Sequence, residues 1–142
     1  MISFQEAKDI VNKNIFQLGS ELVGLAQVGG RVLAQDIIAS FPSPIFDNSA
    51  MDGFAVRYED TQGASQENPV TLKIVSTSSA GTPSKISLKP GECIQCMTGA
   101  KIPDGANSIV MVEDSSGFSD LGTVQIIIET SEGKHIRKMG EE

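Results

Sequence analysis

Residues 44–57 read Pro44-Ile45-Phe46-Asp47-Asn48-Ser49-Ala50-Met51-Asp52-Gly53-Phe54-Ala55-Val56-Arg57, and the character of the chain changes here. Before this stretch, apolar residues recur at helical spacing. After it, short apolar runs alternate with turn residues, a pattern typical of β-strands. The prolines at 42 and 44 favour an extended path between the two parts. A mostly β unit is therefore predicted to begin here.

Five apolar runs in this second part are predicted to be strands, at residues 54–57, 70–76, 92–97, 108–113 and 123–129. The polar stretches 58–69 and 114–121 and the turn Lys89-Pro90-Gly91 connect them. The fold class is therefore α+β, mostly β, with a β-barrel-like or sandwich-like domain of about 90 residues.

The first part predicts a helix-and-strand piece. Ser3 and Glu6 have the spacing of a capping box, and apolar residues on one helical face predict a helix over residues 4–18, ended by Gly19. A shorter helical segment is predicted within residues 25–34, although Gly29-Gly30 weakens it, and a strand over residues 36–39.

The chain carries a formal net charge of -7. Residues 1–41 hold three bases and four acids, and residues 42–142 hold eight bases and fourteen acids, so the acidity lies mostly in the second part. Such a chain repels a phosphate backbone, which excludes nucleic acid as a partner. No apolar run approaches the roughly 20 residues of a membrane span, and no signal peptide is visible, so we expect a cytoplasmic protein.

Cys93 and Cys96 have the CxxC spacing of a redox pair or half a zinc site. They lie in a predicted strand, however, where residues three apart point to opposite faces. No second CxxC accompanies them. The pattern favours two structural cysteines.

Three stretches hold the candidate functional residues. The first is residues 44–55, where Asp47, Asn48, Ser49 and Asp52 lie between side chains that favour burial. The second runs from Met97 to Asn107. There a threonine hydroxyl and backbone N–H groups beside a glycine have the chemistry to hold an oxyanion or a magnesium-bound water. From composition alone, a polar turn and a hairpin connection explain these two stretches as well.

The third stretch is residues 135–142, which hold a basic cluster around Arg137. An arginine fork suits an oxyanion such as phosphate, and a solvated strand edge is the alternative. The chain stops directly after a glycine and two glutamates, which suggests a piece of a longer protein.

Together these stretches resemble the MoeA/gephyrin family of molybdopterin molybdenumtransferases. Residues 46–55 resemble its signature F-D-N-S-A-M-D-G-Y-A, with Phe54 in place of tyrosine. Residues 30–36 resemble its G-R-V-L-A-E-D. Residues 98–113 resemble T-G-A-x-x-P-x-G-A-D-x-V-V-x-x-E with Asn107 in place of aspartate, and residues 133–142 resemble G-x-N-I-R-x-x-G-E-D with His135 in place of asparagine and Glu142 in place of aspartate.

The resemblance implies an enzyme that places molybdate on adenylated molybdopterin and releases AMP, with Mg²⁺ assisting, in molybdenum cofactor biosynthesis. It also implies a homodimer whose active site lies between a later molybdopterin-binding domain of one subunit and this N-terminal region of its partner. The fragment alone is then expected to be inactive. The alternative is a gephyrin-like binding or scaffolding module without catalysis.

The resemblance also implies roles for individual residues. Asp52, Thr98 and Glu142 map onto catalytic positions, with Asp52 and Glu142 as the Mg²⁺ ligands. Carboxylates repel molybdate and phosphate, so Asp52 and Glu142 are more reasonable as oxygen ligands or water-orienting groups for Mg²⁺. Substrate-binding positions are Asp47, Asn48, Ser49, Gly99 and Arg137. The implied domains are residues 1–43 (part of domain I), 44–134 (β-barrel-like domain II) and 135–142 (a truncated return towards domain I).

Overall fold

The computed structural model describes residues 1–16, 18–118 and 122–142, and its chain divides into two compact units, residues 1–38 and 39–142. The domain division expected at residues 43/44 and 134/135 stays a prediction. No helix among the described residues is long and apolar enough to cross a membrane.

The first unit contains helix α1 (Phe4–Asn14), which begins with the predicted capping box. Glu6 N donates to Ser3 Oγ at 3.2 Å, and Ser3 N donates to Glu6 Oε2 at 2.7 Å. The helix ends at Asn14, four residues before the predicted end, and Ile15 is already extended. None of the helical residues is buried, so no packing stabilises a further turn. Residue 17, inside the predicted range, lies outside the described residues.

Two other predictions for the first unit are wrong. Residues 25–34 contain only the 3₁₀ turn η1 (Leu25–Gln27), because Gly29 and Gly30 follow and Gly30 has φ +77°. Residues 36–39 form no strand, since no other described segment pairs with them. In this unit all described residues are intermediate or exposed, so the buried core belongs to the second unit.

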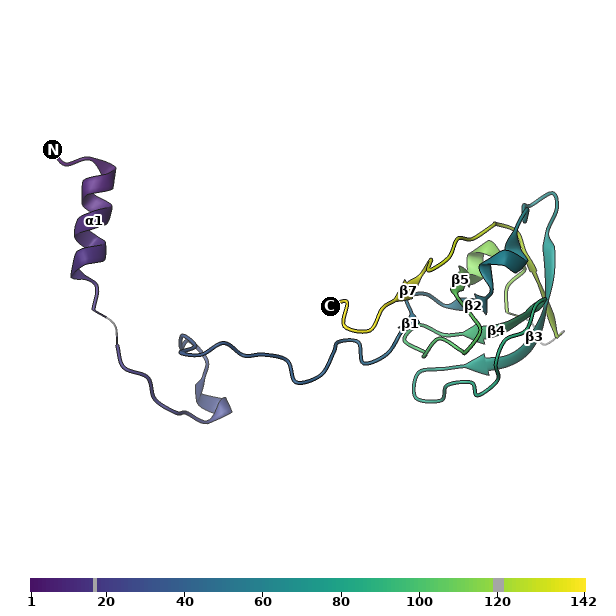
Figure 1. Cartoon of the computed structure of the whole chain (residues 1–142), viewed down its shortest axis with the longest axis horizontal. Coiled ribbons are helices and arrows are strands. Elements are labelled where there is room, and N and C mark those ends of the chain that lie inside the picture. The colour runs from purple at the N-terminus through teal and green to yellow at the C-terminus, as the bar shows by residue number, and fades with distance from the viewer. Residues whose placement is uncertain (17, 119–121) are drawn as a thin grey trace. The chain divides into compact units, whose positions relative to one another are not determined.

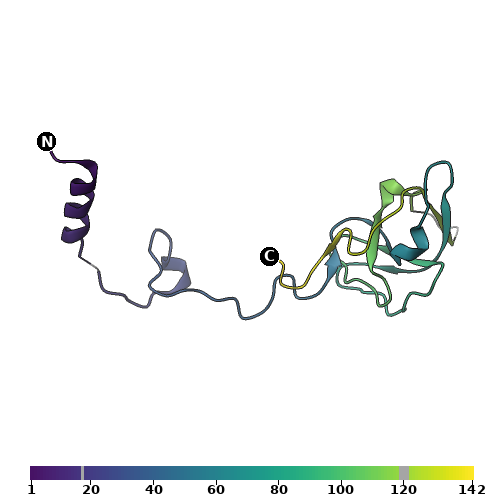
Figure 2. The ribbon, with the colours of Figure 1, turned by 45° about the horizontal axis from the view of Figure 1, so that its top comes forward.

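The second unit is built on a five-stranded sheet in the order β5-β2-β4-β3-β6 (Figure 1). The strands are β2 (Gly53–Val56), β3 (Val70–Ser78), β4 (Glu92–Cys96), β5 (Ser108–Met111) and β6 (Thr123–Ile126). Each predicted strand is therefore confirmed, with ends shifted by a few residues. Figure 2 shows that the sheet is curled into a half-barrel, which confirms the mostly β fold class.

The connections differ from a simple meander. β3 and β4 run parallel, with a register shift between Ile74 and Ser76, whereas the other pairs are antiparallel. β4 and β5 are not neighbours, because β2 lies between them. The hairpin interpretation of residues 97–107 is therefore wrong: this segment crosses over β2. Part of the predicted loop 114–121, residues 119–121, lies outside the described residues.

The sheet is packed on both faces, and alternate residues of one strand serve different cores. One cluster gathers around Phe54, Val56 and Cys93, and the other around Ala55, Ile94 and Cys96. The whole of β2 is buried. Burying one large apolar side chain stabilises a fold by about 1.5–3 kcal/mol, so the two clusters hold the sheet from both sides.

A small second sheet pairs strand β1 (Asn48–Ser49) with β7 (Ile136–Arg137) in antiparallel register (Figure 1). These strands have two residues each, too short to give a periodic pattern in the sequence. The pairing continues beyond them: Gly140 N donates to Pro44 O and Glu142 N donates to Ser43 O, both at 3.0 Å. Residues 135–142 thus return along residues 43–50.

Candidate active site

The loop between β1 and β2 is a hydrogen-bonded turn that presents Asp52. Ser49 Oγ donates to Met51 O at 2.6 Å, and Val112 N donates to Asp52 O at 3.0 Å. Gly53 follows and passes close to β5, where a Cβ atom would lie 2.0 Å from Val110 O. Only glycine fits there, so the sharp entry into β2 depends on Gly53. The Asp52 side chain remains exposed.

The carboxylate of Asp52 is held by Thr98. Thr98 N and Thr98 Oγ1 both donate to Asp52 Oδ1 at 2.7 Å. These two bonds favour the ionised form and hold the pKa of Asp52 below its ordinary value, the backbone bond most strongly. Asp52 Oδ2 has no hydrogen-bond partner within the described chain. The pair therefore presents an anionic oxygen in a fixed position at the surface.

The backbone N–H groups of residues 98–100 are not free, contrary to what the sequence suggested. Thr98 N donates to Asp52, Gly99 N donates to Ser49 O at 2.8 Å, and Ala100 N donates to Met97 O at 2.9 Å. Gly99 has φ +78°, which lets the chain turn back towards β1. The first two bonds fasten the turn to the β1–β2 loop and to β1, the third closes the turn itself, and all three donors are therefore unavailable to an oxyanion.

Two predicted substrate-binding residues face the interior. Ser49 is fully buried and Asn48 is 7% exposed. Asn48 Oδ1 and His135 Nε2 are buried without a hydrogen-bond partner in the described part of the protein. Neither side chain is therefore exposed at the surface that holds Asp52. The substrate-binding roles of Asn48 and Ser49 stay predictions.

Asp47, a third predicted substrate-binding residue, is half-buried and already engaged. Its Oδ1 accepts from Met139 N and its Oδ2 from Lys138 Nζ, both at 2.9 Å. The bond from the Met139 backbone and then the Lys138 contact hold the pKa of Asp47 below its ordinary value. The pairing of Lys138 with Asp47 was not predicted from the sequence, in which the basic cluster around Arg137 was the available signal.

The C-terminal segment places the remaining candidates. Arg137 is exposed on β7 opposite Asn48. Glu142 is exposed, and its Oε2 accepts from Ser43 Oγ at 3.3 Å. No hydrogen bond between described residues joins Glu142 to Asp52 or Thr98. Thus the structure joins Asp52 to Thr98, and Glu142 to the other end of the β1 ladder.

The two predicted Mg²⁺ ligands, Asp52 and Glu142, are not joined by a hydrogen bond between described residues, and their binding of Mg²⁺ stays a prediction. Mg²⁺ prefers carboxylate and phosphate oxygens and keeps several waters, so a single carboxylate together with substrate phosphates is a sufficient protein contribution. Asp52 Oδ2 is the carboxylate oxygen of the Asp52–Thr98 pair that has no hydrogen-bond partner within the described chain. The residues that the structure describes hold no group of three His, Cys, Asp or Glu side chains placed to bind a metal.

The two cysteines are structural, as the strand geometry predicted. Both thiols are free and buried in β4, and they lie in the two different core clusters. Burial raises the pKa of Cys93 to about 12 and that of Cys96 to about 11. Neither thiol is activated as a nucleophile.

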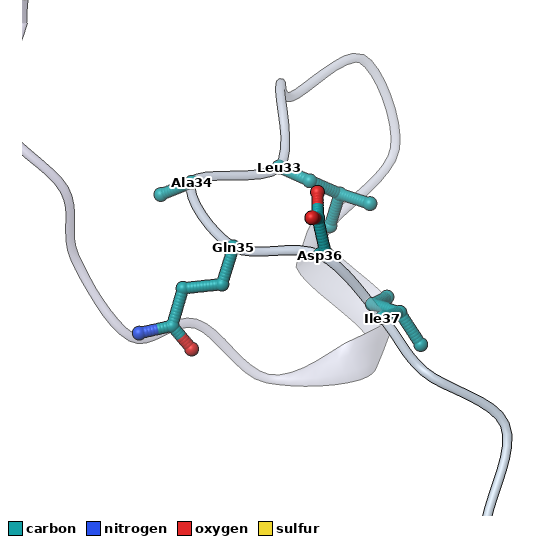
Figure 3. A pocket seen from close by; sticks show the side chains of 5 residues that line it. All are labelled: Leu33, Ala34, Gln35, Asp36 and Ile37. Carbon is teal, nitrogen blue, oxygen red and sulfur yellow. The ribbon is translucent and has the colours of Figure 1, made fainter.

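A hollow outside these stretches does not form a second site. It is lined by residues 33–37, all exposed (Figure 3). Gln35 and Asp36 extend to different sides of the chain in Figure 3, so the polar groups do not converge. The candidate site is therefore the Asp52–Thr98 pair with its neighbouring segments.

The fold and this site together define the class of protein. The fold is a curled mixed sheet, and the site is an exposed Asp–Thr pair on the loop after β1, the strand that pairs with the returning C-terminal strand β7. A family model described as the MoeA N-terminal region (domain I and II) matches residues 2–142. The chain belongs to this family.

Similar proteins agree with this assignment. The chain is 42% identical over all of its 142 residues to molybdopterin molybdenumtransferase 2 of Mycobacterium tuberculosis, covering 35% of that protein. It is 40% identical over 125 residues to molybdopterin molybdenumtransferase of Bacillus subtilis, with 87% of this chain and 29% of that protein covered. The chain thus spans about a third of the length of these relatives.

A solved structure supports the fold directly. The crystal structure of the molybdopterin biosynthesis moeA protein from Pyrococcus horikoshii OT3 matches with a TM-score of 0.83 and 33% identity. The match covers 100% of this chain and 37% of that chain. The architecture described above is therefore that of a MoeA N-terminal region.

Two departures from the family motif have local explanations. His135 has φ +58°, a left-handed conformation in which asparagine and histidine are both enriched. Asn107 Oδ1 accepts from Tyr58 N at 2.7 Å, and its amide donates to Glu59 Oε2 at 3.2 Å. An aspartate at 107 would instead repel Glu59, so the asparagine suits its neighbour here.

Proposed function

We propose that this chain forms one wall of the active site of a molybdopterin molybdenumtransferase. The complete enzyme inserts molybdate into adenylated molybdopterin and releases AMP, in molybdenum cofactor biosynthesis. The observation that carries the proposal is the exposed Asp52 carboxylate, held by two 2.7 Å bonds from Thr98. Relatives named for this activity share this region.

The charges assign the roles. Molybdate, phosphate and the pterin nucleotide are anions, so Asp52 contacts them through a divalent cation and not directly. Mg²⁺, when bound, supplies positive charge against the phosphate oxygens. Asp52 Oδ2 is its ligand from this chain, and Thr98 keeps that oxygen ionised and oriented. Gly99 shapes the turn that carries Thr98.

The C-terminal segment supplies the other groups. Arg137 offers an exposed guanidinium to an anionic substrate. Glu142 is a second acidic group, and it reaches the metal only with substrate and the rest of the protein in place. We further propose a cytoplasmic homodimer in which the remaining two-thirds of the enzyme, absent from this chain, holds the pterin.

The test is AMP release from adenylated molybdopterin, dependent on magnesium and molybdate, with the complete gene product and with the 142-residue chain. Asp52→Asn in the complete protein is expected to lower the rate about 100-fold or more, because the anionic ligand is lost. Glu67→Gln, an exposed carboxylate on the loop before β3, is the matched control.

Each result bears on the proposal. Release by the complete protein alone supports a shared site with this chain as one wall. An unchanged rate in Asp52→Asn removes Asp52 from the site, and turnover by the 142-residue chain alone contradicts the shared site. No release by the complete protein rejects the catalytic function and favours the scaffolding module.

A further inference from the structure

The Asp47 carboxylate lies where the three signature segments of the chain meet. Its backbone carbonyl accepts from Ile102 N at 3.0 Å, which ties it to the segment after Thr98. Its side chain accepts from Met139 N and Lys138 Nζ. One residue of the first segment thus contacts the second through its backbone and the third through its side chain.

Both Asp47 oxygens are occupied within the protein. Oδ1 binds a backbone N–H and Oδ2 binds an ammonium group, each at 2.9 Å. A carboxylate accepts hydrogen bonds from N–H donors and cations, and both partners of Asp47 are of this kind. The position of the Asp47 side chain is therefore explained without a bound ligand. An anionic substrate would be repelled by the Asp47 carboxylate, so a direct contact between the two is unfavourable.

The bond from Met139 N to Asp47 lies in a gap between two backbone contacts of the returning segment. On one side of it, Arg137 pairs with Asn48. On the other side, Gly140 N donates to Pro44 O. Between these points the backbone of residues 138–139 is fastened by Asp47 Oδ1, together with a local bond from Lys138 N to Glu141 Oε2 at 2.6 Å.

We propose that Asp47 is a positioning residue that sets the register and orientation of residues 137–142, and is not a substrate-binding group. This inference rests on the proposed function, because Arg137 and Glu142 are the groups it would place. Asp47, directly before β1, holds the returning segment in place, and Arg137 and Glu142 on that segment contact the substrate.

The backbone bond carries this role more than the ion pair does. The side chains of Lys138 and Asp47 are 61% and 41% exposed, so water screens their attraction. The Met139 N–H, by contrast, has a fixed direction and one acceptor. Asparagine keeps an oxygen for that N–H, whereas alanine removes it.

The test uses Asp47→Ala, Asp47→Asn and Lys138→Met in the complete protein, with AMP release and backbone amide exchange measured on each. Asp47→Ala is expected to speed exchange at Met139 and to lower kcat about 10- to 100-fold, because the groups it places shift. Asp47→Asn and Lys138→Met are expected to keep the Met139 protection and to stay within about 3-fold of the wild-type kcat. Amides of β2 and β4 serve as the folding control and should be unchanged.

The outcomes separate the alternatives. Loss of activity in Asp47→Asn with Met139 protection intact would overturn the proposal in favour of a direct substrate contact. Unchanged Met139 exchange in Asp47→Ala would also overturn it. If the wild-type protein releases no AMP, the proposed function fails, while the exchange measurement still decides whether Asp47 holds the segment.

Discussion

At the scale of single residues, the Asp52–Thr98 pair combines exposure with a fixed orientation. A free surface carboxylate samples several rotamers, whereas two donors from one residue hold Asp52 Oδ1. The two bonds come from the backbone and the side chain of Thr98, and these can be separated by mutation.

Thr98→Val is expected to raise the pKa of Asp52 towards its ordinary 3.8, because the hydroxyl donor is lost while the backbone donor remains. The wild-type pKa is lowered, so the stabilisation is present above the unfolded pKa and is lost as the pH falls through the folded pKa. The measurement is an NMR titration of the Asp52 carboxyl carbon between about pH 2 and 6, which spans aspartate titration.

Asp47 is the internal control for that titration. Its pKa is lowered by Met139 and Lys138, which Thr98→Val does not touch. A shift of both carboxyls would mean that the variant disturbs the fold. An Asp52 titration identical to the wild type would mean that the hydroxyl bond is absent in solution.

Gly53 is required because a side chain there would clash with β5. Substituting it measures the cost of this clash, as distinct from the cost of backbone strain. Gly53→Ala would place Cβ 2.0 Å from Val110 O, between two hydrogen-bonded strands. We expect the unfolding free energy to fall by about 3 kcal/mol or more. Urea denaturation followed by circular dichroism measures the change.

Gly63→Ala is the matched comparison for Gly53→Ala. Nothing lies within 4 Å of the position that its new methyl group would take, and its φ is +75°, so the cost is backbone strain alone, about 1 kcal/mol. Equal losses in the two variants would show that the close approach to β5 does not decide the need for glycine at 53.

At the scale of elements, β4 shows how one strand serves two cores. Cys93 packs with Phe54 and Val56 on one face, while Ile94 and Cys96 pack on the other. β2 alternates in the same way beside it. The segment leaving β4 then crosses over β2, which brings Thr98 to Asp52.

The two thiols in β4 are expected to react with a thiol reagent at least about 100-fold more slowly in the native protein than in the unfolded chain, because burial suppresses the thiolate. With pKa values of about 12 for Cys93 and about 11 for Cys96, both thiols are protonated at pH 8 and react slowly. Absorbance of released thionitrobenzoate, with and without guanidinium, measures both rates. Rapid native labelling, or a disulfide between Cys93 and Cys96, would contradict the two-face arrangement.

At the scale of the whole molecule, the buried core belongs to residues 39–142. In residues 1–38, apolar side chains such as Phe4 and Leu25 are exposed, and none of the described residues is buried. The second unit has two clusters of its own and a closing ladder between β1 and β7. It therefore meets the requirement for folding alone.

A chain of residues 39–142 is expected to keep its melting temperature within about 3 °C of the 142-residue chain. Removing residues 135–142 instead should lower it by about 5 °C or more, because the β1–β7 ladder and the bonds to Pro44 and Ser43 are lost. Calorimetry compares the two truncations. A large loss on removing residues 1–38 would show that the first unit stabilises the second.

Local patterns determined much of this protein. The alternating runs that became β2 to β6 and the capping box at Ser3 depend on neighbours in the chain, so the sequence alone predicted them. The opposite faces of Cys93 and Cys96 follow from strand geometry in the same way. The candidate site could be predicted as three stretches, because their residues match a family motif in order and spacing.

Tertiary structure alone decided how those stretches meet. The order of strands, the crossing of residues 97–107 over β2 and the two-residue pairing of β1 with β7 depend on contacts between distant segments. So does the assignment of partners: Thr98 to Asp52, and Met139 with Lys138 to Asp47. A hydrogen bond between residues 46 or 92 positions apart leaves no periodic trace in the sequence, because its geometry is set by the packed sheet that brings the two ends together.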